Sequence, residues 1–520
     1  MNRTYPILLI TFFSWAIIGV GTGRGELPSK PSAASPSKPN IVYILADDLG
    51  YGELGCYGQQ KIETPNIDEL AAQGMRFTQH YSGSPVCAPA RCVLLTGKHT
   101  GHARIRGNDE WSERGDTWNY AKMVEDPNLE GQRPLLAGTI TIGTRLQSVG
   151  YKTAIIGKWG LGAPLTEGIP NKQGFDFFYG YNCQRQAHTF YPKHLWKNQD
   201  KHWLDNKLVV PGTKLDEEAD PHDPNSYVLF TLQQYSPELM LNEAVGFIQE
   251  NKDRPFFLYF ASPIPHVPLQ APKRWVNYYQ KKFGPEDPYL GNRGYFPHRT
   301  PRAAYAAMVS YLDESVGVLV ATLKRLGLFE NTLILFSSDN GPTFNGGSDS
   351  AFFDSAAPFK SERGWAKGYV HEGGIRVPMI AHWPEKIAGG QTSDHISAFW
   401  DVLPTLCEIA GAETPHGIDG ISFSATLWGN AEQREHSFLY WEFPSYNGQQ
   451  AVRLGEWKGI RKDIFDGNLE LELFNLKDDP REQSNVASAN PAIVAQIETI
   501  MRREHSPASL EKFKMPQLGD

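Results

Sequence analysis

Residues 41–48 read Ile-Val-Tyr-Ile-Leu-Ala-Asp-Asp, an apolar run that stops at two carboxylates. Three later segments repeat this layout of an apolar run followed by polar residues: 153–157 before Lys158, 256–261 before Pro265-His266, and 332–336 before Ser337-Ser338-Asp339-Asn340. Near-continuous runs of β-branched, aromatic and aliphatic residues are typical of strands buried on both faces of a parallel sheet. The pattern predicts an α/β fold in which these segments share one sheet.

Helical patterns lie between the predicted strands. One begins with Thr64 as its cap and Pro65 in its first turn, and it stops at Gly74. A longer helix carries an apolar stripe at helical spacing, formed by Met308, Leu312, Val316, Leu319 and Leu323. We interpret this stripe as core packing, with no functional role.

The composition is that of a soluble globular protein. The 520 residues are 40% hydrophobic and 21% charged, and 58 acidic against 50 basic side chains give a formal net charge of -8. Coating a nucleic acid or an anionic membrane requires a basic surface, so the balance excludes both roles.

The N-terminus has the pattern of an export signal. Arg3 precedes an apolar run at 7–20, and glycines follow at 21, 23 and 25, which predicts a signal peptide over residues 1–25. Residues 26–38 are rich in Pro, Ser and Ala and read as a linker. An uncleaved membrane anchor or a misplaced start is the alternative. We expect an exported protein, periplasmic or secreted, with no stable membrane span once the signal is cleaved.

The polar residues at the strand ends suggest a metal site. In open α/β sheets, ligands bind outside the carboxyl ends of the strands, so Asp47, Asp48, Asp339 and Asn340 should converge. Oxygen-only ligands favour Ca2+ or Mg2+ over zinc. Taken singly, such a pair is more often a turn or a helix cap, but two pairs at comparable strand ends favour the metal.

Cys87 is the candidate nucleophile among five cysteines, the others being Cys56, Cys92, Cys183 and Cys407, whose pairing the sequence leaves open. Residues 84–96 run from a turn into a helix expected to start near Pro89, and a helix N-terminus lowers a thiol's pKa. Arg91, four residues on, can lie on the same face and bind a tetrahedral oxyanion. The alternative is a small buried cysteine beside a surface arginine. A divalent cation next to a nucleophile suggests phosphoryl or sulfuryl transfer.

Several motifs together resemble the type I, formylglycine-dependent sulfatases, of which arylsulfatase A is an example. Cys87-Ala-Pro-Ala-Arg91 with Leu95-Thr-Gly97 is similar to the segment whose cysteine is oxidised to Cα-formylglycine during export. The remaining matches are residues 39–52, Ser338-Asp-Asn-Gly341, Lys367-Gly368, 372–378, 473–476 and 478–480. They span about residues 39–490 in the family's order.

The resemblance implies an alkaline-phosphatase-like fold, with a large mixed sheet sandwiched by helices and a smaller C-terminal α+β subdomain with a short antiparallel sheet. We therefore expect a catalytic domain over residues 39–430 and a C-terminal subdomain over 431–520. The sequence agrees, since 436–443 and 450–461 read as strands and 491–503 reads as an amphipathic helix.

The resemblance also implies a mechanism for cleaving a sulfate monoester. The four oxygen-bearing residues would bind Ca2+, or Mg2+, with the formylglycine made from Cys87 completing the shell. A hydroxyl of the hydrated aldehyde attacks sulfur and the alcohol leaves, after which the second hydroxyl expels sulfate. Arg91 would hold the hydrated aldehyde and Asp339 could take its proton. Lys158 and Lys367 would grip sulfate oxygens, and His266 would help the leaving group depart.

The chain departs from the family at one position. Many members have a histidine two residues after the lysine, but here Lys158-Trp159 is followed by Gly160. We hypothesise that His188 or Gln184 fills this gap, with a surface loop histidine as the alternative for His188. Partners implied by the resemblance are a sulfated small molecule or saccharide and a formylglycine-generating maturation enzyme.

Two other functions are open. A phosphonate or phosphodiester hydrolase on the same fold would share the substrate's shape and the metal, whereas a catalytically silent carbohydrate-binding relative would have no need of the Cys87 signature. Specificity should lie in segments that fit no strand pattern, namely 104–134, 184–224 and 344–359. Their aromatic side chains could stack on a sugar or an aryl group, or only pack their own loops: Trp111, Trp118, Tyr191, Trp196, Trp203, Phe352 and Phe353.

Overall fold

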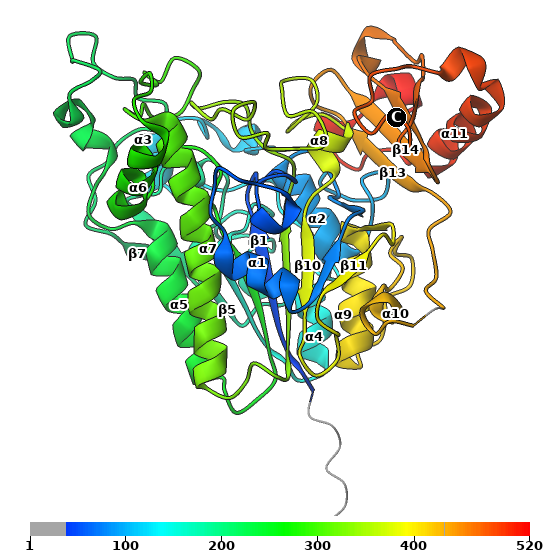
Figure 1. Ribbon diagram of the computed structural model, residues 1–520, viewed down its shortest axis with the longest axis horizontal. Coiled ribbons are helices and arrows are strands. Elements are labelled where there is room, and N and C mark those ends of the chain that lie inside the picture. The colour runs from blue at the N-terminus through cyan, green and yellow to red at the C-terminus, as the bar shows by residue number, and fades with distance from the viewer. Residues whose placement is uncertain (1–37, 431) are drawn as a thin grey trace, which may run out of the picture. The chain divides into compact units, whose positions relative to one another are not determined.

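The computed structural model of the protein describes residues 38–430 and 432–520. A ten-stranded mixed sheet forms its centre, in the order β11-β2-β10-β9-β1-β8-β4-β5-β6-β7 (Figure 1). Its strands are β1 (Asn40–Ala46), β2 (Met75–Phe77), β4 (Lys152–Lys158), β5 (Phe177–Tyr181), β6 (His194–Lys197), β7 (Asp200–Trp203), β8 (Phe256–Ala261), β9 (Thr332–Ser338), β10 (Met379–His382) and β11 (Gln391–Ser393). A separate pair joins β3 (His80–Tyr81) to β12 (Ser397–Ala398).

The four strands predicted from the sequence are neighbours in this sheet. They are β9, β1, β8 and β4, which lie side by side and run parallel. The edges of the sheet are mixed, because β10 pairs antiparallel with β9, and β6 pairs antiparallel with β5. The predicted α/β class and large mixed sheet are therefore confirmed.

Helices cover both faces of the sheet, and the alternation along β1 shows why. Ile41 and Tyr43 belong to one core cluster, whereas Val42 and Ile44 belong to the other. Figure 1 shows α5 and α7 on one side and α4 and α9 on the other. The helices are α1 (Pro65–Ala72), α2 (Cys87–Thr96), α3 (Tyr120–Glu125), α4 (Ile142–Ser148), α5 (Ser236–Glu250), α6 (Lys273–Phe283), α7 (Pro301–Arg325), α8 (Glu372–Ile375), α9 (Val402–Ala410), α10 (Ser424–Leu427) and α11 (Pro491–Glu504).

The predicted helix with the Met308 stripe is α7, and its stripe is buried in the core as expected. Within the described residues, α7 is also the one helix long and apolar enough to cross a membrane, and 72% of its apolar window is buried. A helix covered to this extent by the rest of the protein is a core helix. The predicted signal peptide and most of the predicted linker lie outside the described residues.

The C-terminal part is a four-stranded antiparallel sheet packed against α11, as expected. Its strands are β13 (Leu439–Phe443), β14 (Gln449–Leu454), β15 (Trp457–Arg461) and β16 (Glu472–Asn475). One detail of the prediction is wrong, because residues 450–461 form a hairpin of two strands rather than one strand. Gly455, with a φ of +58°, makes the tight turn between them.

The C-terminal sheet joins the larger part through buried contacts. Trp441 of β13 packs in the same core cluster as the large sheet, and its indole donates a hydrogen bond to the Ser82 carbonyl at 2.8 Å. Lys458 of β15 is fully buried, with its Nζ 2.8 Å from Glu372 Oε1 and 3.0 Å from Glu482 Oε1. Because Glu372 begins α8, this ion pair fixes the C-terminal sheet beside the segment that carries Lys367.

Candidate active site

Polar residues predicted from four strand ends meet at one edge of the sheet. Asp47 and Asp48 follow β1, Lys158 ends β4, and Asp339 and Asn340 follow β9. Ala46 is in register with Ser338, so the two acidic pairs leave the sheet at the same level. His266 reaches the same place from the loop after β8, with its Nε2 3.6 Å from Asp48 Oδ2. The predicted convergence is confirmed.

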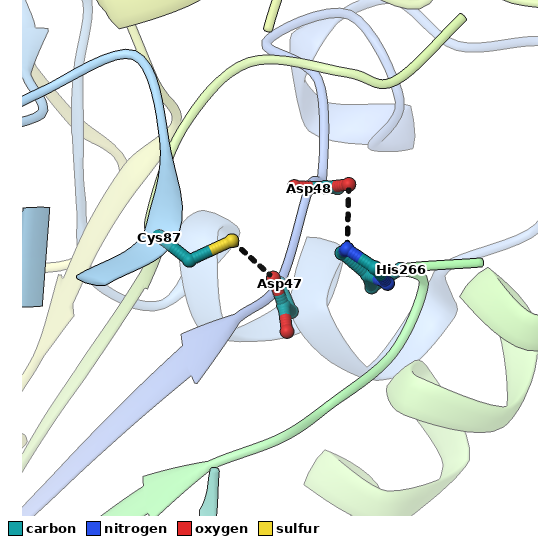
Figure 2. Close-up of side chains that lie close together, drawn as sticks. All are labelled: Asp47, Asp48, Cys87 and His266. Atoms are coloured by element: carbon teal, nitrogen blue, oxygen red, sulfur yellow. Dashed lines mark hydrogen bonds and ion pairs between the residues drawn. The ribbon is translucent and has the colours of Figure 1, made fainter. Parts of the chain in front are cut away.

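Cys87 lies at the start of α2, directly over this edge. Figure 2 shows its side chain pointing toward Asp47, whose Oδ1 is 3.4 Å from the sulfur. The Lys367 ammonium approaches the sulfur from another side at 3.6 Å. The helix begins at Cys87 itself rather than near Pro89, which places the thiol at the first helical position.

The expected lowering of the thiol's pKa is wrong. Cys87 is buried, and its burial together with the adjacent Asp47 carboxylate raises the pKa of the thiol above its usual value, although Lys158 and Lys367 oppose this. The Asn108 side chain also accepts the Ala88 backbone N–H at 3.0 Å. Loss of water around the sulfur therefore outweighs the effect of the helix N-terminus.

Arg91 is fully buried and links the two acidic pairs. Its Nε and Nη2 donate to Asp339 Oδ2 at 3.1 and 2.8 Å, and Nη2 lies 3.6 Å from Asp47 Oδ2. Its Nη1 donates to the carbonyl of Lys158 at 2.7 Å. The alternative interpretation, a surface arginine, is therefore wrong. The Arg91 guanidinium is buried and connects Asp339 to Asp47.

Two lysines complete the charge balance. Lys158 Nζ lies 2.6 Å from Asp47 Oδ2, and Lys367 Nζ lies 2.7 Å from Asp48. Lys367 lies on a loop between β9 and α8. No strand or helix positions it, so its place in the site is set by tertiary contacts. Three carboxylates thus face three basic side chains, a concentration of positive groups that the net charge of the whole chain does not reveal.

Burial and these neighbours shift the acids in different directions. Burial opposes ionisation of Asp47, but Lys158, His266 and Arg91 outweigh it and lower its pKa. Burial and the nearby Asp47 raise the pKa of Asp339 to about 7. Burial together with Lys367 lowers the pKa of His266 well below its usual value. Carboxylates packed this closely favour a bound cation.

The chemistry of the donor set fits a hard cation. Asn340 donates from Nδ2 to Asp48 Oδ1 at 2.7 Å and to the Gly341 carbonyl at 2.9 Å. Its Oδ1 is buried without a hydrogen-bond partner, which is the atom a cation would use. Asp47, Asp48, Cys87 and His266 also bring possible ligand atoms within 4.8 Å of one another. The residues present therefore suit Ca2+ or Mg2+.

The space beside Gly160 is taken by glutamines. A Cβ at this position would lie 3.0 Å from Gln132 Oε1 and 3.2 Å from Gln184 Nε2, and Gly160 has a φ of +78°. Both amide atoms are buried without a partner. His188 lies instead against His266, with ring centroids 5.6 Å apart at 13°. Of the two residues hypothesised to fill the gap, Gln184 is the one that lies there. Gln132 lies there as well, and no sequence pattern predicted it.

The site opens into a pocket of about 240 Å³. Its lining includes Lys367, His266, His188 and Gln184 from the site, and further out the residues Asn108, Glu110, Trp118, Tyr295, Phe344, Asn345, Phe443, Ser445, Tyr446 and Lys512. Of the seven loop aromatic residues named from the sequence, Trp118 alone lines this pocket. Tyr295, Phe443 and Tyr446 were missed, because loops and strand ends without periodic patterns carry them.

The comparisons with known proteins agree with this geometry. A family model described as Sulfatase matches residues 39–412, and one described as N-sulphoglucosamine sulphohydrolase, C-terminal, matches 361–506. The chain is 33% identical to human arylsulfatase A over 441 residues, which cover 81% of the chain and 74% of that protein. It is 32% identical to N-acetylgalactosamine-6-sulfatase from Rattus norvegicus over 448 residues, covering 82% of the chain and 72% of that protein.

Solved structures give the same fold. The crystal structure of Ps i-CgsB in complex with k-i-k-neocarrahexaose has a TM-score of 0.71 at 27% identity, covering 91% of this chain and 94% of that one. The phosphonate monoester hydrolase of Agrobacterium radiobacter has a TM-score of 0.61 at 19% identity, covering 90% and 96%. The second likeness is one of fold alone.

Proposed function

Because the chain belongs to the sulfatase family and is a sulfuric ester hydrolase acting on sulfated carbohydrates or aryl sulfates, we propose that Cys87 becomes its catalytic Cα-formylglycine. The observation that carries the proposal is the position of Cys87 Sγ, between Asp47 Oδ1 at 3.4 Å and Lys367 Nζ at 3.6 Å. When formed, the aldehyde supplies a hydrated nucleophile, and a bound Ca2+ supplies positive charge for the sulfate oxygens.

Asp47, Asp48, Asp339 and Asn340 would hold the cation, together with the modified Cys87. The unpartnered Asn340 Oδ1 supports this assignment. All of these ligand atoms would be oxygens, which suits Ca2+, with Mg2+ as the second possibility. Asp48 adopts a left-handed backbone conformation, with a φ of +67°, which turns the chain sharply at the end of β1.

Two lysines would bind the sulfate group, and an arginine would orient the nucleophile that attacks it. Lys158 and Lys367 reach the site from different elements, and their ammonium groups lie 2.6 and 2.7 Å from the carboxylates of Asp47 and Asp48. Arg91 is fixed by two hydrogen bonds to Asp339, so it would orient the nucleophile without moving. Fixed cations in a buried site stabilise developing negative charge strongly, because no water has to reorganise.

His266 would pass a proton to the leaving oxygen from Nε2. Because burial and Lys367 lower the pKa of the free imidazole, Nε2 would carry this proton only once the negative charge of a bound sulfate favours the imidazolium. Its Nδ1 donates to the carbonyl of Val267, which leaves Nε2 facing Asp48 and the pocket. Asp339 would accept the proton of the attacking hydroxyl. At the gap beside Gly160 we propose that Gln184 donates a hydrogen bond from its unpartnered Nε2, because this amide lines the pocket whereas His188 packs on His266.

Export and maturation belong to the same proposal. Residues 1–25 would direct export to the periplasm or the outside of the cell, and a formylglycine-generating enzyme would modify Cys87. Residues 39–430 would form the catalytic domain and 431–520 the C-terminal subdomain, which supplies part of the pocket wall through Ser445 and Tyr446.

The intact mass of the exported protein tests the central step. Conversion of Cys87 from thiol to aldehyde lowers the mass, and the Cys87→Ala variant serves as the matched control that cannot be converted. We expect converted protein to release sulfate from sulfate esters and to lose this activity with a calcium chelator. An exported protein that keeps its thiol, or one that cleaves phosphonates or phosphodiesters faster than sulfate esters, would overturn the proposal.

A further inference from the structure

The mouth of the pocket carries two large aromatic rings that the rest of the fold leaves exposed. Trp118 is 60% exposed and Tyr446 is 47% exposed, yet both line the pocket that Lys367 also lines. They come from distant parts of the chain, Trp118 from the loop before α3 and Tyr446 from the loop between β13 and β14. Exposed aromatic rings gathered at a pocket mouth mark a binding surface.

Both rings are held in place by their neighbours. The Arg185 guanidinium lies 4.7 Å from the Trp118 ring centre and covers one face, and it also donates to the Trp118 carbonyl. Tyr446 stacks on Phe443, with ring centres 6.0 Å apart at 29°, and its ring lies over Gly368. A Cβ on Gly368 would come within 2.8 Å of the Tyr446 ring, so the glycine allows this close approach.

Hydrogen-bonding groups line the same pocket as these rings. Asn108, Glu110, Asn345 and Ser445 offer amide, carboxyl and hydroxyl groups. A sugar ring needs this combination, because its C–H faces pack on aromatic rings while its rim of hydroxyls needs donors and acceptors. A plain aryl group would leave these polar groups unpaired, at a cost in binding.

We propose that Trp118 and Tyr446 hold the sugar ring next to the sulfated one, so that the substrate is a sulfated oligosaccharide rather than a simple aryl sulfate. This inference rests on the proposed function and adds the substrate class to it. The sulfated ring lies against Lys367 and His266 in the inner pocket, and the neighbouring ring lies between the two aromatic side chains.

Steady-state kinetics on paired substrates tests the inference. The substrates are 4-nitrophenyl sulfate, N-acetylgalactosamine 6-sulfate, a chondroitin 6-sulfate tetrasaccharide and a sulfated neocarrahexaose. The variants are Trp118→Ala, the ring-preserving Trp118→Phe, and Tyr446→Asn, since asparagine tolerates the left-handed backbone at this position, where φ is +50°. The control is Trp203→Ala, because Trp203 is 56% exposed but does not line the pocket.

We expect wild type to prefer an oligosaccharide, and Trp118→Ala and Tyr446→Asn each to lower kcat/KM on it by about tenfold, with little change on 4-nitrophenyl sulfate. Trp118→Phe should keep most of the activity, and Trp203→Ala should match wild type. Equal losses on both substrate types, or no loss on the oligosaccharide, would overturn the inference while the sulfatase assignment stands. Failure of wild type on every sulfate ester would instead remove the proposed function itself.

Discussion

Replacing Lys458 by methionine should destabilise the protein by removing the charge that two buried carboxylates share. Lys458 is fully buried and lies 2.8 Å from Glu372 and 3.0 Å from Glu482. Glu372 keeps other partners in the variant, since Arg376 Nη1 and the Tyr81 hydroxyl lie 3.0 and 2.8 Å from its Oε2. Glu482 keeps the hydrogen bond from the Glu372 backbone N–H but loses its cationic partner, so it becomes the unpaired buried acid.

The expected loss in the free energy of unfolding is about 3–5 kcal/mol at pH 8, the usual cost of removing one partner of a buried ion pair. The loss should shrink at lower pH. Burial already raises the pKa of Glu482 from 4.5 to about 7 in the folded protein, and without Lys458 it rises further. A folded-state pKa above the unfolded value adds stability at low pH that is lost as pH rises through it, at about 1.4 kcal/mol per unit.

Urea unfolding followed by tryptophan fluorescence at pH 6 and pH 8 measures the effect, after a check that the protein refolds. The matched control is Lys462→Met, one residue after the end of the same strand. Lys462 pairs with Glu472 at 2.9 Å, but both side chains are about one-third exposed, so we expect a change below about 1 kcal/mol. A loss for Lys458→Met that equals the control, or that is larger at pH 6 than at pH 8, would refute the reasoning.

Three further predictions concern the proposed active site. Asn340→Leu should weaken Ca2+ binding by about 10- to 100-fold, seen as a smaller Ca2+-induced rise in thermal stability as well as lower activity. Gln184→Leu should lower kcat/KM by about tenfold, since it removes a hydrogen bond to an anion, and His188→Ala should cost less; the reverse order would assign the gap to His188. Cys87→Ala should abolish turnover while keeping the urea midpoint near that of wild type, and residual turnover would exclude Cys87 as the nucleophile.

The strand ends were predictable because local pattern and sheet geometry both specify them. The apolar runs before Asp47 and Asp339 identify buried parallel strands, and parallel strands deliver their carboxyl ends to one edge. Resemblance to a family supplied Lys367, which no strand or helix pattern positions. Only the structure shows that the Asn340 side-chain oxygen is buried without a hydrogen-bond partner and so is available to a cation, because this depends on packing.

The remaining parts of the site depend on contacts between distant loops. Gln132 and Gln184 meet beside Gly160 only after two irregular segments fold together, and neither carries a periodic signal. The same is true of Tyr446, which reaches Gly368 from the C-terminal sheet. For Cys87 the local structure was predicted correctly, as a helix N-terminus, but the direction of the pKa shift was not. Burial of the thiol, which the sequence does not reveal, raises its pKa.

The pocket wall draws on both ends of the described chain, and this has a consequence for synthesis. Val86 and Asn108 leave the ribosome early, whereas Tyr446 and Lys512, which line the same pocket, leave it near the end. A chain stopped after residue 430 would contain each side chain proposed for the chemistry, yet it would lack the ring that covers Gly368 beside Lys367. The part of the wall that would choose a sugar is therefore completed last as the protein is made.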